Sequence, residues 1–96
     1  MPVKTRAWDA AETLDTPERI ARYLEAAFED GDPALITAAI GDAARAHGMS
    51  DLARETGLAR EALYRALSET GNPEFATVLK VLRALGVQLT TSKLVR

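Results

Sequence analysis

The sequence contains no cysteine, which excludes a disulfide framework and a thiolate metal site. Aromatic residues make up only 5% of the chain, so its core must be built mainly from Leu, Ala, Val and Ile, which favours packed helices. No run reaches the ~18 apolar residues that a membrane span requires. The first residues are not followed by a long apolar stretch, which argues against a signal peptide, so we expect a cytoplasmic protein.

The net charge is −2, and the acidic and basic residues are distributed unevenly along the chain. Residues 1–33 carry four Lys or Arg and eight Asp or Glu, whereas residues 34–96 carry eight and six. Acidic side chains close to the phosphates would repel DNA, so the N-terminal part is expected to face away from DNA, toward a basic partner. The length of 96 residues suits one domain, and a core this small would gain stability from a dimer interface.

Residues 49–68 combine two short helical patterns that meet at Gly57. Two such helices joined by a short glycine-containing turn are the signature of a helix-turn-helix. Ala53 is expected where the two helices cross, and Gly57 is expected in a left-handed conformation. Leu63 and Leu67 then fall on the buried face of the second helix.

The outer face of that second helix is expected to read DNA. In helix-turn-helix proteins the start of this helix meets base edges in the major groove, where Arg can donate two bonds to guanine. Glu61 could accept from cytosine or hold Arg65, and Arg54 could reach a phosphate or pair with Glu55. The alternative is a helical hairpin with a solvated charged face. The predicted DNA-contacting residues are Ser50, Arg54, Ala59, Arg60, Glu61, Tyr64, Arg65, Thr70, Gly71 and Asn72.

Start and stop signals predict five helices in an all-α fold. Thr16 or Asp15 can cap the first helix, and Pro17 fits its first turn. Asp32-Pro33 repeats this signal. The predicted helices span residues 17–30, 33–47, 50–56, 59–68 and 73–85.

The remaining boundaries rest on single residues. Gly48 is expected to end the second helix with a left-handed cap, and Ser50 and Asn72 to cap the third and fifth helices. The last helix is expected to bury Phe75, Val78, Leu79, Leu82 and Leu85.

Residues beyond Gly86 alternate apolar and polar side chains from Val87 to Thr91, which predicts a short strand. A single strand needs a partner, and the same strand of a second subunit in a twofold dimer is one answer; an unstructured tail is the other. The predicted organisation is an N-terminal arm at 1–14 and one helical domain at 15–96.

The chain offers no arrangement of residues typical of an enzyme. His47 has no second ligand nearby for a metal and no nucleophile at a suitable spacing. The acidic residues are scattered over helix faces, without a phosphate-binding loop or a metal cluster. An enzyme is therefore the weakest interpretation, and no cofactor is expected.

Several motifs together resemble the addiction-module antidote proteins, which are HigA-like antitoxins with a phage-repressor, Cro-type helix-turn-helix. The similarity extends from about Trp8 to Leu89. The motifs are Trp8-Asp9, Tyr23-Leu24-Glu25, Gly48-Met49-Ser50, Leu52-Ala53-Arg54-Glu55-Thr56-Gly57-Leu58, Glu61-Ala62-Leu63-Tyr64 and Gly71-Asn72-Pro73.

The resemblance implies a lambda-repressor-like domain that binds operator DNA, represses its own operon and neutralises a RelE/ParE-like toxin. Such toxins tend to be basic, which would suit an acidic docking surface. The residues expected to bind the toxin are Trp8, Glu18, Tyr23, Glu25, Glu29 and Asp30. Trp8 and Tyr23 could equally belong to the protein's own core. Two other interpretations stay open, a stand-alone phage-type regulator without a toxin and a helical protein-interaction module.

Overall fold

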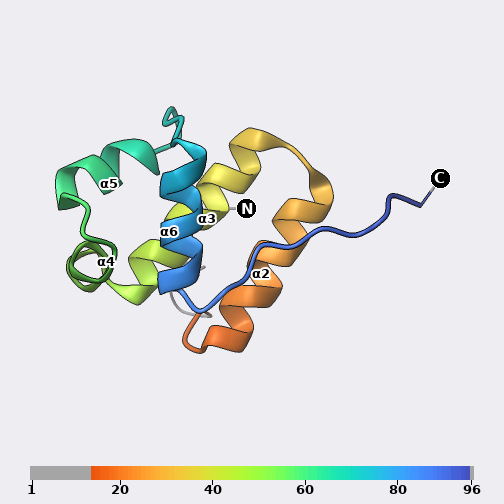
Figure 1. Ribbon diagram of the computed structural model, residues 1–96, viewed down its shortest axis with the longest axis horizontal. Coiled ribbons are helices and arrows are strands. Elements are labelled where there is room, and N and C mark those ends of the chain that lie inside the picture. Colours follow the sequence, from red (N-terminus) through yellow and green to blue (C-terminus); the bar gives the residue numbers. More distant parts are fainter. Residues whose placement is uncertain (1–13, 96) are drawn as a thin grey trace, which may run out of the picture.

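A computed structural model describes residues 14–95, which form five α-helices, as predicted. Figure 1 shows the helices packed around a common centre, with α4 and α5 at one side and α2 at the other. Within residues 14–95 no helix is both long and apolar enough to cross a membrane. The helices are α2 (Pro17–Asp30), α3 (Pro33–His47), α4 (Met49–Thr56), α5 (Arg60–Ala66) and α6 (Phe75–Ala84).

Local signals define α2 and the start of α3. The Thr16 hydroxyl accepts a hydrogen bond from the Arg19 amide at 3.2 Å, and the Asp32 carboxylate accepts one from the Leu35 amide at 3.2 Å. A proline occupies the first turn of each helix, where its missing N–H group costs nothing. Both helices have the predicted bounds.

Gly48 alone connects α3 to α4. Its amide donates to the Ala44 carbonyl and its own carbonyl accepts from the Leu52 amide, each at 2.9 Å. The predicted left-handed cap is wrong, because φ is positive at 108° but ψ is 114°. The predicted Ser50 cap is also wrong: Gly48 is the N-cap of α4, and no side chain caps this end. Ser50 lies exposed in the first turn of the helix.

The last two helices are shorter than predicted. Helix α5 ends at Ala66 rather than 68, and α6 begins at Phe75 rather than 73. Glu74 is the N-cap of α6, so Asn72 and Pro73 belong to the preceding loop and the predicted Asn72 cap is wrong. The loop conformation is set by contacts with α5 described below.

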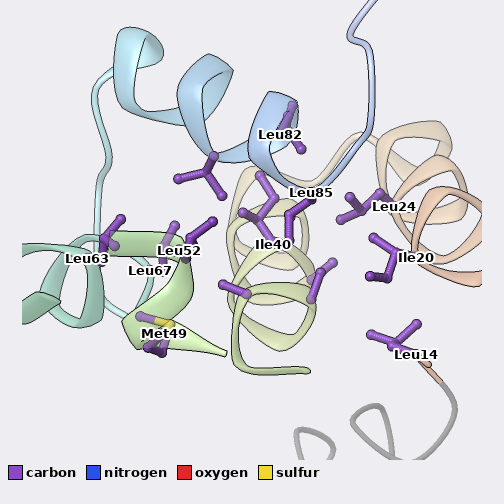
Figure 2. Close-up of a cluster of buried hydrophobic side chains, with 14 of the residues drawn as sticks. Leu14, Ile20, Leu24, Ile40, Met49, Leu52, Leu63, Leu67, Leu82 and Leu85 are labelled. Atoms are coloured by element: carbon purple, nitrogen blue, oxygen red, sulfur yellow. The ribbon is translucent and has the colours of Figure 1, made fainter. Parts of the chain in front are cut away.

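One hydrophobic cluster joins all five helices (Figure 2). At α6, the predicted core residues Leu82 and Leu85 are buried, and Val78 is partly buried against the cluster. Val81 and Leu82 are buried, whereas Phe75 is 67% exposed and Leu79 is 41% exposed. Both Phe75 and Leu79 were therefore wrongly assigned to the core. The buried cluster consists of Leu14, Ile20, Leu24, Ala27, Ala39, Ile40, Ala43, Ala44, Met49, Leu52, Leu63, Leu67, Val81, Leu82 and Leu85.

A carboxylate also lies inside this core. Asp42 is 1% exposed, and a buried charge is costly unless hydrogen bonds compensate it. The Tyr23 hydroxyl donates to its Oδ2 at 2.6 Å, and Arg45 donates to its Oδ1 at 2.9 Å. This network ties α2 to α3 in addition to their apolar contacts.

The chain after α6 does not form the predicted strand. Within residues 14–95 nothing is assigned as strand. Val87 and Leu89 pack partly buried against the core, and the segment shares a groove with Ala21, Leu24 and Phe28 of α2. Figure 1 shows this segment running across α2. The side chains of this segment do alternate in burial, but residues 14–95 contain no neighbouring strand to pair with it.

Candidate nucleic-acid interface

The turn between α4 and α5 has the geometry predicted at Gly57. This residue is left-handed, with φ 76° and ψ 11°, and its amide donates to the Ala53 carbonyl at 2.9 Å. Thr56 adds a link that was not predicted. Its hydroxyl donates to the Leu52 carbonyl at 2.7 Å and accepts from the Leu58 amide at 3.3 Å. The end of α4 and the turn are thereby held together.

Two buried leucines hold α5 against the body of the protein. Leu63 is 1% exposed and Leu67 is 2% exposed, as predicted for the inner face of this helix. Both belong to the buried cluster, and Figure 2 shows them on the same side of it as Leu52 and Met49. Helix α5 has only seven residues and no side-chain cap at its N-terminus, so packing must supply most of its stability.

Two glycines let the backbone approach the end of α5 closely. A Cβ atom on Gly41 of α3 would lie 2.6 Å from the Leu67 carbonyl oxygen, and one on Gly71 would lie 2.1 Å from the Ala66 carbonyl oxygen. Neither contact leaves room for a side chain. Gly71 was predicted as a DNA contact, whereas Gly41 was not singled out because a glycine within a helix gives no clear signal.

The outer face of α5 exposes the predicted reading residues. Arg60, Glu61, Tyr64 and Arg65 are all exposed. The Arg60 guanidinium lies 5.5 Å from the centre of the Tyr64 ring, within the range of a cation–π contact. Glu61 and Arg65 form no ion pair with each other among the described residues, so of the two roles considered for Glu61, the support of Arg65 is not seen in the structure.

One groove is lined by Arg65 and by three other residues that were predicted to contact DNA. Thr70, Gly71 and Asn72 line it, with Ala62 of α5 and Thr77 of α6 on its other sides. Glu74 also lines this groove and adds a negative charge. The loop is closed by two bonds at 2.9 Å, from the Ser68 hydroxyl to the Arg65 carbonyl and from the Gly71 amide to the Ser68 carbonyl.

The remaining predicted DNA contacts lie on α4 and at the start of α5. Arg54 pairs with Asp51 at 2.7 Å, not with Glu55, and both partners are more than half exposed. Ala59 is the exposed N-cap residue of α5. Glu55 instead meets His47 at 2.9 Å, which links the end of α3 to α4. A surface ion pair such as Arg54–Asp51 is weak and can be exchanged for another partner.

The predicted toxin-binding residues of α2 fall into two groups. Glu18, Glu25 and Glu29 are exposed and form no ion pair within residues 14–95, and Asp30 is exposed while accepting the Asp32 amide at 3.3 Å. Tyr23 is half-buried and bonded to Asp42, which favours the alternative that it serves the protein's own packing. Trp8 lies outside the described residues.

A known protein family matches nearly the whole chain. Residues 4–93 match the family described as probable addiction module antidote proteins. The chain belongs to this family. Family membership indicates a toxin–antitoxin role, with a toxin of some kind as the partner.

An uncharacterised protein of Haemophilus influenzae is 48% identical over 88 residues, which cover 92% of this chain and 91% of the relative. No solved structure matches the chain. Among residues 14–95 of this antidote-family protein, no three His, Asp or Glu side chains are placed together to hold a metal ion.

Proposed function

We propose that this protein is the antitoxin of a type II toxin–antitoxin module, which binds operator DNA through α4 and α5, represses its own operon and neutralises a RelE/ParE-like toxin. The observation that carries the DNA part is the arrangement of α5. Its inner leucines are fully buried, while Arg60, Tyr64 and Arg65 face outward from a helix that begins just after the Gly57 turn. Helix-turn-helix proteins read the major groove with such a helix.

The two arginines of α5 have different surroundings and therefore different expected roles. Arg60 rests near the Tyr64 ring, which limits its conformations before DNA arrives and so reduces the entropy lost on binding. Its guanidinium can donate two bonds to a guanine edge. Arg65 lines one groove with Thr70 and Asn72, so it is proposed to position the protein on the phosphates together with that loop.

The DNA proposal is tested by fluorescence anisotropy with the duplex that precedes the gene. Arg60→Ala should weaken specific binding by about 1–3 kcal/mol, the value of one bidentate base contact. Arg22→Ala is the matched control, because Arg22 is an exposed arginine on α2 without an ion pair among the described residues. Equal affinities of Arg60→Ala, Tyr64→Ala and the control would show that α5 is not the reading helix.

The toxin part rests on the outer face of α2. Glu18, Arg22, Glu25 and Glu29 follow one another at intervals of four, three and four residues, which places them on one stripe of the helix. Three carboxylates against one guanidinium make this stripe acidic. An acidic surface would speed the encounter with a basic toxin and disfavour wrong orientations.

Surface substitutions test the toxin part better than deletion of α2, because deletion would remove Ile20, Leu24 and Ala27 from the core. The double variant Glu25→Lys with Glu29→Lys should fail to rescue cells that express the toxin from the neighbouring reading frame. Glu69→Lys with Glu74→Lys, at two exposed positions outside α2, is the matched charge control. If wild type rescues growth and the double variant rescues equally, the α2 stripe is not the docking surface.

A stand-alone regulator is the second candidate. The reading helix would serve such a protein equally well, so the DNA experiment does not separate the two. The presence of an adjacent toxin reading frame and its neutralisation by the wild-type protein decide between them. Without either, the regulator is the better description.

A further inference from the structure

Two grooves flank the chain that follows α6, and they carry opposite charges. Residues 86–89 line both of them. The groove toward α6 contains Lys80 and Arg83. The other groove lies between α2 and residues 86–90, and its lining within residues 14–95 contains Glu25 and no basic residue. Figure 1 shows this part of the chain crossing α2, on the side of the molecule away from α4 and α5. The second groove, called the α2 groove below, is therefore acidic and separate from the proposed DNA surface.

The walls of the α2 groove are mainly apolar. Phe28, Val87 and Leu89 are partly buried and pack against the core, and Ala21 and Leu24 complete the apolar lining. The volume of the groove is about 290 Å³, just below the ~300–1,000 Å³ that is typical of small-molecule sites. We therefore expect the groove to receive apolar side chains of a protein partner.

Glu25 connects the α2 groove to the acidic stripe of α2. It lines the groove and also belongs to the stripe that it forms with Glu18 and Glu29. These three carboxylates are exposed and form no ion pair within residues 14–95. A partner that fills the groove meets the carboxylates at the same time. This combination fits an apolar side chain flanked by Lys or Arg, and it repels the phosphates of DNA.

We propose that the α2 groove holds an apolar side chain of the toxin, with Lys or Arg residues of the same toxin segment facing Glu25 and the stripe. The inference rests on the proposed function and adds an apolar anchor to the acidic surface named there. Anchors that fill pockets carry most of the affinity of an interface, whereas charges at its rim mainly change the rate of association. The groove should therefore determine how fast the toxin dissociates, and the carboxylates how fast it binds.

Filling the groove with a neutral side chain tests the anchor. Ala21 is partly exposed on the groove wall, and Gln is a good helix former, so Ala21→Gln should keep α2 intact. Biolayer interferometry with the full chain and the toxin of the neighbouring reading frame measures both rates. Ala21→Gln should raise the dissociation constant at least about tenfold, through faster dissociation.

Ala26→Gln is the matched control for the anchor. Ala26 is exposed on the same helix and lies about 140° around it from Ala21, beyond the acidic stripe. This variant should bind the toxin as tightly as the wild type. Circular dichroism checks that both variants are folded.

Neutralising the charge that lines the groove tests the chemistry of the partner. Glu25→Gln should slow association with the toxin several-fold at low salt and reduce its salt dependence, with less effect on dissociation. Glu69→Gln, at an exposed position outside α2, is the control. The same association rate and salt dependence in both variants would contradict a cationic flank on the toxin segment.

The outcomes separate this inference from the proposed function. A wild-type protein that does not bind the toxin would overturn both. A wild-type protein that binds it, together with equal affinities of Ala21→Gln and Ala26→Gln, would overturn the anchor alone. Sedimentation of the free variants distinguishes another occupant. If Ala21→Gln changes the oligomeric state while its toxin affinity equals that of Ala26→Gln, the groove belongs to a contact between copies of this chain and the inference is wrong.

Discussion

Helices α2 and α5 lie on one core but are stabilised in different ways. Helix α2 has 14 residues, a Thr16 cap, a proline in its first turn and a left-handed Gly31 at its end. Helix α5 has seven residues and no N-terminal side-chain cap, and it depends on Leu63, Leu67 and close backbone contacts. The helix of the proposed toxin surface is therefore stabilised largely by caps at its own ends. The helix of the proposed DNA surface is stabilised largely by the residues that pack against it.

The largest expected effect is the loss of the main side chain that holds α5. Leu63→Ala should lower the free energy of unfolding by about 2–5 kcal/mol, because it leaves a cavity at a fully buried site. Urea unfolding followed by far-UV circular dichroism measures this. Tyr64→Ala on the exposed side of the same helix is the control and should cost much less. Similar costs for both would mean that α5 does not depend on the core in this way.

The second-largest effect on α5 is expected when a substitution adds one methyl group to α3. Gly41→Ala would normally favour a helix, but here its Cβ meets the Leu67 carbonyl, so we expect a loss of about 1–3 kcal/mol. Operator affinity should fall as well, because the end of α5 must move. Gly31→Ala strains only α2, where no atom lies within 4 Å of the added Cβ, and should leave operator affinity unchanged. A Gly41→Ala protein more stable than wild type would contradict this.

Removal of the α2 cap should have a smaller and purely local effect. Thr16→Ala should cost about 1 kcal/mol, since one amide of the first turn loses its acceptor. Thermal unfolding measures the loss, and Thr16→Ser should restore most of it. The DNA affinity of both variants should match wild type, and any fall would show that the two helices are coupled.

The smallest change in stability is expected at the Arg54–Asp51 pair. Both side chains are more than half exposed, so Arg54→Ala should alter the free energy of unfolding by less than about 0.5 kcal/mol. If Arg54 contacts a phosphate, its loss should weaken binding to all sequences evenly and lower the salt dependence. Affinity measured at several salt concentrations with operator and unrelated duplexes would detect this, and unchanged slopes would remove Arg54 from the interface.

The contrast between α2 and α5 also explains what sequence could and could not predict. Caps and prolines act within one turn, so Thr16-Pro17 and Asp32-Pro33 yielded correct helix starts. Asn72-Pro73 looked like another start but is not: Glu74 is the N-cap of α6, and the loop before it packs Gly71 closely against the Ala66 carbonyl. The Asn-Pro pattern alone does not record how the preceding loop packs on the end of α5.

Other features depended on neighbours that the sequence does not identify. The apolar residues of α6 could be placed on two different faces of the helix. In the folded protein Val81 is buried, whereas Phe75 is exposed. The buried Asp42 accepts hydrogen bonds from Tyr23 of α2, which is distant in sequence, and from Arg45 one turn further along α3. For the candidate site, the outward direction of Arg60, Glu61, Tyr64 and Arg65 was predicted from helical periodicity, whereas Gly41 beneath the end of α5 was not.

The approach of α3 to α5 at Gly41 has a consequence for how this protein could change. The end of α5 is positioned through a backbone carbonyl and two buried leucines, none of which belongs to the outer face. Substitutions at 60, 61, 64 and 65 can therefore accumulate without moving the helix. Under the proposed function, a duplicated gene could acquire a new operator through those four positions alone while keeping the same α2 surface for its toxin. The same separation would let an engineer redirect the DNA specificity on an unchanged scaffold.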